Sequence, residues 1–157
     1  MTQPRLRPVA DDDRAFLVEL YGEVREPELA HVPWDQATRR AFVEHQFAAQ
    51  DAHYRENYPG ATLDVVEVDG ERAGRLYVHR GPSDIRIMDI GLLAAFRGRG
   101  IGTGLLRTLV HEAAAGGRKL SIHVEGNNPA RTLYDRLGFG PAGEHGVYVL
   151  MERAAGT

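Results

Sequence analysis

A glycine-rich turn joins an apolar run to a helical pattern and restricts the choice of fold more than any other segment. Residues 92–109 read LLAAFRGRGIGTGLLRTL. The apolar run is expected to end a strand, and the leucine spacing after the turn predicts a helix over 102–115. Glycines let the backbone come close to a ligand, and the first N–H groups of a helix attract an anion. The turn therefore predicts a phosphate-binding site at a strand-to-helix junction.

The spacing of the glycines excludes two common phosphate-binding motifs. A dinucleotide fingerprint would require glycine at position 103 or 105, where the chain has Thr103 and Leu105. A P-loop is excluded because no Gly-Lys-Ser or Gly-Lys-Thr occurs. What remains is Arg-x-x-Gly-x-Gly at Arg97, Gly100 and Gly102, whose amides and arginine side chain suit a pyrophosphate. A glycine bend without a ligand is the alternative.

The order of the remaining elements indicates a mixed α/β layer fold. Strands are expected at 5–9, 83–93, 119–125 and 146–153, and a hairpin over 62–80 turns at Asp69-Gly70, a dipeptide that tolerates positive φ. Helices are expected at 11–26, 34–58, 102–115 and 128–139. Asn128 is suited to cap the last helix and Gly138 to end it.

Composition sets the class of protein. A chain of 157 residues with 43% hydrophobic content predicts a single domain over 1–157. The chain has no cysteine, which excludes disulfides, thiolate metal sites and a cysteine nucleophile. No apolar run is long enough to span a membrane and the first residues lack the apolar centre of a signal peptide, so a cytoplasmic protein is expected.

Charge is divided unevenly along the chain. The net charge of −3 predicts neither a nucleic-acid nor a membrane partner. Residues 1–71 hold 15 acidic against 7 basic side chains, net −8, and residues 72–157 hold 7 against 12, net +5. This division favours an anionic ligand on the C-terminal half and a cationic one facing the N-terminal half, and chance clustering of surface charge is the alternative.

Two segments carry a resemblance to the GNAT superfamily of N-acetyltransferases. The stretch LLAAFRGRGIGTGLL resembles the superfamily's acetyl-CoA pyrophosphate motif, although Ala94 stands where many relatives have proline. The stretch NNPARTLYDRLGF is similar to the family's Asn-x-x-Ala-x-x-x-Tyr-x-x-x-Gly-Phe segment. The element order extends the resemblance over essentially the whole chain. It implies a GNAT-like acyltransferase fold: a central mixed, mostly antiparallel sheet with helices on both faces.

The resemblance also implies acetyl-CoA as acyl donor. No metal is expected, because the sequence has neither a His-Glu-x-x-His motif nor the cysteine pair of a zinc deaminase site. The backbone of Leu92 and Leu93 would pair with the pantetheine arm, and Asn127, or Asn128 in its place, would also contact it. The cofactor-binding residues that the resemblance implies are Leu92, Leu93, Arg97, Gly98, Arg99, Gly100, Ile101, Gly102, Thr103, Asn127 and Asn128.

Acetyl transfer requires a neutral amine, a stabilised oxyanion and a proton for the leaving thiolate. Tyr134 is expected to supply the proton, and a core aromatic is the alternative for this residue. A backbone N–H near Leu92 or Leu93 would meet the oxyanion, where the family's strand splays from its neighbour. Without cysteine, direct transfer in a ternary complex is the natural mechanism.

Three side chains are candidates for the general base. Asp89 lies in an otherwise apolar strand, where burial strengthens a carboxylate as a base, but an ion pair with Arg86 or another arginine explains it equally. Glu125 is the second candidate and His123 the third. A water chain without a dedicated base is a further alternative.

These features predict an N-acetyltransferase acting on a small-molecule or peptide amine. A coenzyme A-binding sensor or scaffold without turnover is the alternative, and a dinucleotide binder is a third. The acceptor pocket is expected to contain Trp34, Gln50, Tyr54 and Tyr58, with acidic residues Glu44, Asp51 and Glu56 drawing a cationic amine. A packing helix with a wet acidic face is the competing interpretation. The sequence leaves a homodimer open.

Overall fold

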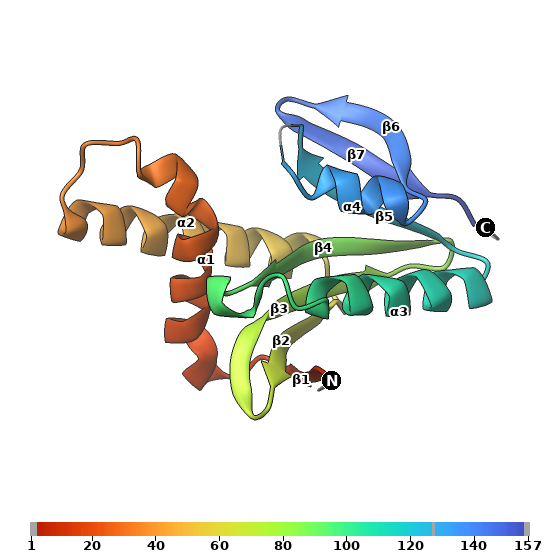
Figure 1. Cartoon of the computed structure of the whole chain (residues 1–157), viewed down its shortest axis with the longest axis horizontal. Helices are drawn as coiled ribbons and strands as arrows, with labels where there is room; N and C mark the ends of the chain where they lie inside the picture. The colour runs from red at the N-terminus through yellow and green to blue at the C-terminus, as the bar shows by residue number, and fades with distance from the viewer. Residues whose placement is uncertain (1–2, 127, 156–157) are drawn as a thin grey trace.

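The chain forms one seven-stranded sheet with helices on both faces (Figure 1), in a computed structural model that describes residues 3–126 and 128–155. The strand order is β1-β2-β3-β4-β5-β7-β6. The strands are β1 (Arg5–Pro8), β2 (Thr62–Val68), β3 (Glu71–Arg80), β4 (Asp84–Leu92), β5 (Lys119–Glu125), β6 (Gly140–His145) and β7 (Tyr148–Arg153). Neighbouring strands pair antiparallel except β4 and β5, which are parallel. The predicted mixed, mostly antiparallel sheet is confirmed.

The helices divide between the two faces because side chains alternate along each strand. The helices are α1 (Arg14–Leu29), α2 (Gln36–Asn57), α3 (Ile101–Ala115) and α4 (Arg131–Arg136), with short 3₁₀ turns η1 (Asp11–Asp13) and η2 (Ala94–Phe96). Val65 packs with the buried side chains of α1 and α2, whereas its neighbour Val66 packs with those of α3. Two apolar cores therefore lie on opposite sides of one sheet. None of the described helices is long and apolar enough to cross a membrane.

Local turn chemistry shapes the N-terminal half as expected. Asp69 and Gly70 have φ values of 53° and 79°. Positive φ at both central residues gives a two-residue hairpin turn that matches the twist of its strands. The predicted β2–β3 hairpin is confirmed.

Several element boundaries differ by a few residues from those expected. Helix α1, for example, begins at Arg14 rather than 11 and ends at Leu29 rather than 26. The helix after the glycine turn begins at Ile101, one residue early. The last helix begins at Arg131 rather than 128, because the Asn128 side chain accepts a hydrogen bond from the Ala130 N–H (2.9 Å) and forms a separate turn. One or two strands are expected after the last helix: the one over 146–153 begins at Tyr148, and β6 is the second, which pairs with it in a hairpin.

Candidate active site

The sheet opens between its two parallel strands. β4 and β5 are paired from Asp84 with Lys119 to Ile87 with Ile122 and no further. Beyond this point β4 continues to Leu92 along β3, while β5 continues to Glu125 along β7. One edge of residues 88–92 therefore lacks a strand partner. An extended ligand with its own amide groups fits such an edge by completing the ladder.

The glycine turn lies directly after this open edge. Gly98 and Gly100 have φ values of 74° and 80°, and a Cβ at either position would meet nothing within 4 Å. The first intrahelical backbone bond of α3 runs from the Gly104 N–H to the Gly100 carbonyl, and no side chain caps the helix. The N–H groups of residues 101–103 thus have no acceptor in their own helix. These observations fit a pyrophosphate, because an open glycine turn and uncapped amides provide both space and donors.

The two arginines of the turn point to different places. The Arg97 Nε donates to the Leu92 carbonyl at 2.9 Å, so its side chain folds back onto the end of β4. The Arg99 guanidinium lies 5.2 Å from the centre of the Phe96 ring. Glu23 of α1 accepts a hydrogen bond from the Ala94 N–H (2.7 Å) and anchors the segment from the other side. These contacts hold the N-terminal end of the turn.

The two leucines expected to face the donor differ in their backbone bonding. The Leu93 N–H donates to the Ala73 carbonyl on β3 at 2.8 Å, so it is not available to a ligand. Because backbone groups alternate in direction along an antiparallel pair, the N–H and C=O of Leu92 and Ile90 face away from β3, toward the open edge. Of the two leucines, Leu92 is the better oxyanion donor. Ile90 was not anticipated from the sequence.

The asparagine pair expected to contact pantetheine is only partly described. Asn127 lies outside the described residues. The Asn128 N–H donates to the Glu125 carbonyl at 3.0 Å, and its side-chain oxygen is used by the Ala130 N–H. Asn128 therefore shapes the turn from β5 into α4.

Tyr134 is a buried residue on α4, 5% exposed, with its ring 5.7 Å from that of Phe139. Burial, and secondarily the charge of Asp89, raises the pKa of Tyr134 to about 12. A phenol with this pKa is fully protonated at neutral pH and can donate a hydrogen bond to a thiolate. The packing role and the donor role are thus compatible in this residue.

Asp89 is held in an ion pair, but with a different arginine from Arg86. Its Oδ2 lies 2.7 Å from the Nη2 of Arg75, which is 4% exposed, and accepts a second hydrogen bond from the Tyr54 hydroxyl at 3.1 Å. Arg86 instead donates to the Ser121 hydroxyl at 2.7 Å. A carboxylate committed to a buried guanidinium is a poor proton acceptor, so these contacts favour the structural interpretation of Asp89.

His123 presents a donor rather than a base. Its Nδ1 lies 3.1 Å from the Arg86 Nη1, and because an arginine only donates, Nδ1 must be the accepting nitrogen. Burial, together with Arg86 and His145, lowers the pKa of His123. The neutral ring therefore carries its hydrogen on Nε2. The only accepting nitrogen of the neutral ring faces the Arg86 guanidinium, so His123 is poorly placed to accept a proton.

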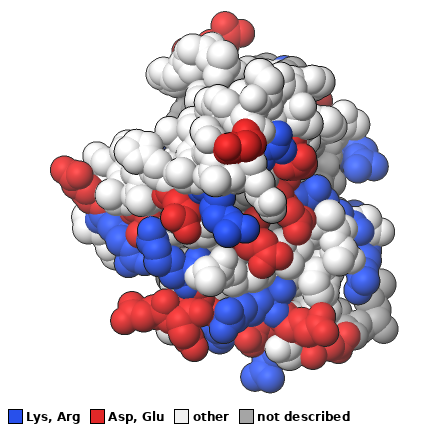
Figure 2. Space-filling view, turned by 90° about the vertical axis from the view of Figure 1, so that its left-hand side faces the viewer, with Lys and Arg blue, Asp and Glu red and all other residues white. Residues whose placement is uncertain are grey.

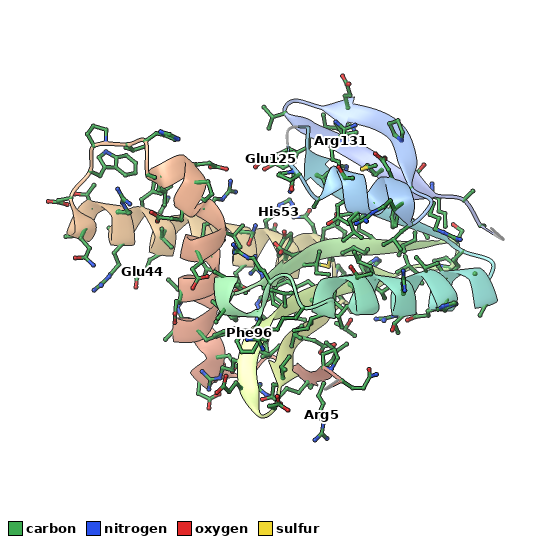
Figure 3. The ribbon with its side chains drawn as sticks, in the orientation of Figure 1. Arg5, Glu44, His53, Phe96, Glu125 and Arg131 are labelled. Atoms are coloured by element: carbon green, nitrogen blue, oxygen red, sulfur yellow. The ribbon has the colours of Figure 1, made fainter. Side chains whose placement is uncertain are left out.

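Glu125 lines a cleft where the end of α1 approaches β5 and β7. The cleft has a volume of about 700 Å³ and is lined by Arg25, Glu28, Glu125, Gly126, Val147 and Tyr148. Arg25 of α1 and Glu125 of β5 face each other with 3.5 Å between Nη1 and Oε1. Figure 3 shows Glu125 on the side of the β5–β7 unit that faces α1. Of the carboxylates expected to be catalytic, Glu125 is the more loosely held.

The residues expected to line an acceptor pocket are largely used in packing. Gln50 accepts from Arg75 at 2.6 Å, Tyr58 lies against His79, and Trp34 packs on Phe42. Figure 3 shows Glu44 on α2, directed away from the β5–β7 unit. On the face shown in Figure 2, acidic and basic side chains are interspersed and form no separate acidic patch.

Sequence reasoning missed several residues of this region. Arg75 and Tyr77 are buried on β3, and the Tyr77 hydroxyl is the one buried side-chain polar atom without a hydrogen bond in the described part of the chain. Arg75 carries no sequence signal, because an arginine in a strand normally faces solvent. Among residues 3–126 and 128–155, no group of three or more His, Cys, Asp or Glu side chains is arranged to hold a metal ion.

Comparison with known proteins identifies the family and the fold. A model of the acetyltransferase (GNAT) family matches residues 25–139. The chain therefore belongs to the GNAT acetyltransferase family. Solved structures show the same fold: the PaiA N-acetyltransferase of Thermoplasma acidophilum in complex with coenzyme A has a TM-score of 0.72 at 14% identity, covering 97% of this chain and 99% of that one. Arabidopsis thaliana Naa50, in complex with the bisubstrate analogue CoA-Ac-MVNAL, has a TM-score of 0.62 at 16% identity, covering 97% and 99%.

Curated relatives are more similar in sequence. The mycothiol acetyltransferase of Corynebacterium glutamicum (strain ATCC 13032) is 36% identical over 138 residues, which cover 78% of this chain and 46% of the relative. A Bacillus subtilis (strain 168) relative, named for alanine N-acetylation of ribosomal protein bS18, is 33% identical over 98 residues, covering 60% and 65%. The chain spans about half the length of the mycothiol acetyltransferases that it matches.

Proposed function

We propose that this chain transfers an acetyl group from acetyl-CoA directly to a primary amine of a small molecule or peptide. The observation that carries the proposal is the open edge of β4 beside the uncapped N-terminus of α3. The names of the relatives support acetyl as the group transferred. They also support both classes of acceptor, since one relative is named for mycothiol, a small molecule, and another for an alanine of a ribosomal protein.

The donor would lie across this junction. The amides of residues 101–103 and the glycine turn would hold its pyrophosphate. Its pantetheine arm would run along β4 and pair with the free backbone groups of Ile90 and Leu92. In this structure the Arg97 side chain donates a hydrogen bond to the Leu92 carbonyl. An amide of the pantetheine arm would replace Arg97 as the donor to that carbonyl, and Arg97 would then be free to bind the phosphates.

The proposed reaction replaces the C–S bond of the thioester with the C–N bond of an amide. The amine nitrogen attacks the thioester carbonyl, the C–N bond forms, and the C–S bond breaks as the thiolate leaves. The Leu92 N–H would stabilise the oxyanion. Tyr134 would donate its hydrogen bond to the thiolate, which finally takes up the proton that the amine loses.

Glu125 is the base that we favour. It lines the cleft and makes only a long contact with Arg25, whereas Asp89 is committed to Arg75. The acceptor amine would enter between Arg25 and Tyr148, where it reaches Glu125. Asp89 is the second candidate for this role.

The test is release of free thiol from acetyl-CoA in the presence of amines, peptides with free N-termini and aminoglycosides. The chain has no cysteine and so contributes no background thiol. We expect turnover with at least one acceptor, and a much lower rate in Tyr134→Phe. Binding of acetyl-CoA without turnover on any acceptor would instead favour a sensor or scaffold, and absence of binding would refute the proposal.

A further inference from the structure

Strand β4 changes both of its partners at one residue. The β3–β4 register passes from Tyr77 with Asp89 to Val78 with Ile87, so Met88 is the extra residue of a bulge. Pairing with β5 also ends at Ile87. The bulge and the opening of the sheet therefore coincide at Met88. Bulges of this kind redirect a strand and are common beside active sites.

A helix supplies a hydrogen bond to the strand at this residue. The Tyr54 hydroxyl of α2 lies 3.1 Å from the Met88 carbonyl oxygen and 3.1 Å from the Asp89 Oδ2. Burial, and next the charge of Asp89, raises the pKa of Tyr54, so the hydroxyl remains a donor. Its ring also lies edge-on against Tyr77, with the centroids 5.9 Å apart. Tyr54 thus contacts the bulge from outside the sheet.

The contacts around Tyr54 form a connected network. Arg75 on β3 donates to Asp89 at 2.7 Å and to Gln50 at 2.6 Å, and Gln50 lies one turn before Tyr54 on α2. Helix α2 is thereby joined to β3 through Gln50 and to β4 through Tyr54. A network whose members hold one another leaves little freedom to any of them.

We infer that Tyr54 is a positioning residue that sets the course of residues 88–92 of β4 along the pantetheine arm of the donor. The inference rests on the proposed function. Fixing the Met88 carbonyl fixes the direction in which β4 leaves β5, and the free groups of Ile90 and Leu92 follow two and four residues later. Tyr54 acts through the backbone and touches no reacting atom.

The location of the Tyr54 contact predicts which part of the donor is affected when the contact is lost. The segment that leads into the glycine turn has anchors outside residues 88–92: the Leu93 N–H donates to the Ala73 carbonyl of β3, and the Ala94 N–H donates to Glu23 of α1. Loss of the Tyr54 hydroxyl should therefore weaken contacts to the pantetheine arm and spare those to the nucleotide. A defect in folding would weaken both equally.

The test compares two ligands on two variants. Coenzyme A carries the arm, whereas 3′-phosphoadenosine 5′-diphosphate has the same nucleotide and diphosphate without it. Tyr54→Phe keeps the ring and its packing, so the protein is expected to fold. The matched control is Tyr58→Phe, at the residue that directly follows α2. The Tyr58 hydroxyl makes no hydrogen bond in the described part of the chain, and its ring packs on Tyr54 and His79. Dissociation constants are measured by calorimetry.

We expect Tyr54→Phe to bind coenzyme A about three- to tenfold more weakly, the effect of one lost hydrogen bond, and to bind the nucleotide fragment like the wild type. Tyr58→Phe should match the wild type with both ligands. Equal weakening of both ligands, or unchanged binding of coenzyme A, would overturn the inference. Failure of the wild type to bind coenzyme A would refute the proposed function instead.

Discussion

Arg75 and Asp89 form a 2.7 Å ion pair under the open edge of the sheet, joining β3 to the residue after the bulge of β4. The guanidinium side chain is 5% exposed and the carboxylate 21%. Removal of the negative charge would leave a buried cation without its partner.

Asp89→Asn is therefore expected to lower the free energy of unfolding by about 3 kcal/mol, near the lower end for a broken buried ion pair. Urea denaturation measures the change. The double variant Arg75→Met with Asp89→Asn should recover most of the loss, because the unpaired charge is gone. An Asp89→Asn protein as stable as the wild type but without turnover would restore Asp89 as the base.

Tyr134→Phe is expected to lower kcat by about 100-fold and leave the KM for acetyl-CoA nearly unchanged, because the hydroxyl would act on the leaving thiolate. The pKa of about 12 adds a pH prediction. The protonated form is the active one and persists up to that pH, so Tyr134 should cause no loss of rate between pH 7 and pH 10. Initial rates over this range, at saturating donor, provide the test.

Glu125→Gln is expected to lower kcat by about 100-fold if Glu125 is the base, because an amide cannot take up the proton of the amine. Its long contact with Arg25 is partly exposed, so stability should change by less than about 1 kcal/mol. Glu28→Gln is the matched control, since Glu28 contacts the same arginine at 3.2 Å. Equal loss of rate in both variants would show that the charge of the cleft, not a base, is responsible.

Gly100→Ala should destabilise the protein and weaken coenzyme A binding, whereas Gly104→Ala should stabilise the protein. At Gly100 the φ of 80° strains an alanine by about 1 kcal/mol, and the added methyl enters the open space of the turn. Coenzyme A affinity should fall by about tenfold. Gly104 lies within α3 with open space around it, so alanine there should stabilise the protein by about 0.5–1 kcal/mol. Thermal unfolding and calorimetry separate the two results.

Asp13 predicts how the protein responds to acid. Its buried carboxylate accepts two 2.8 Å hydrogen bonds from Arg7 and pairs with Arg72. The hydrogen bond from Arg7 lowers the pKa of Asp13 from 3.8 to about 2. The native state favours the ionised form, so this stabilisation is complete above about pH 4 and is lost as the pH falls toward 2.

Asp13→Ala should cost about 3–5 kcal/mol at neutral pH and remove this part of the acid dependence. Asp12→Ala is the control, because Asp12 lies exposed in the same turn. Unfolding by urea at pH 3 and pH 7 gives both quantities. Equal losses in the two variants would mean that the turn itself, rather than the ion pair, is needed.

Local signals predicted much of this structure. The turn at Asp69-Gly70 and the left-handed glycines at 98 and 100 depend on backbone preferences that are written in a few adjacent residues. Strand β6 had no such signal, because residues 140–145 include a proline and two glycines. It forms through its pairing with β7, a tertiary effect that overrides local preference.

Partners that are distant in the sequence could not be predicted. Asp89 has Arg86 close by in the chain, yet it pairs with Arg75 on the neighbouring strand. The bulge at Met88 and the bond from Tyr54 depend on strand register and helix placement, which emerge only when the whole sheet is assembled. The same holds for the tautomer of His123, which Arg86 decides from another strand.

Strands β1–β4 are joined to β5–β7 within the sheet by four residue pairs only, from Asp84 with Lys119 to Ile87 with Ile122. The sheet therefore consists of two parts that are hydrogen-bonded to each other over a short length only. A ligand lying along β4 would make the backbone hydrogen bonds that no neighbouring strand makes at residues 88–92. On the proposed function, part of the hydrogen bonding of this sheet would therefore come from a bound molecule rather than from the chain.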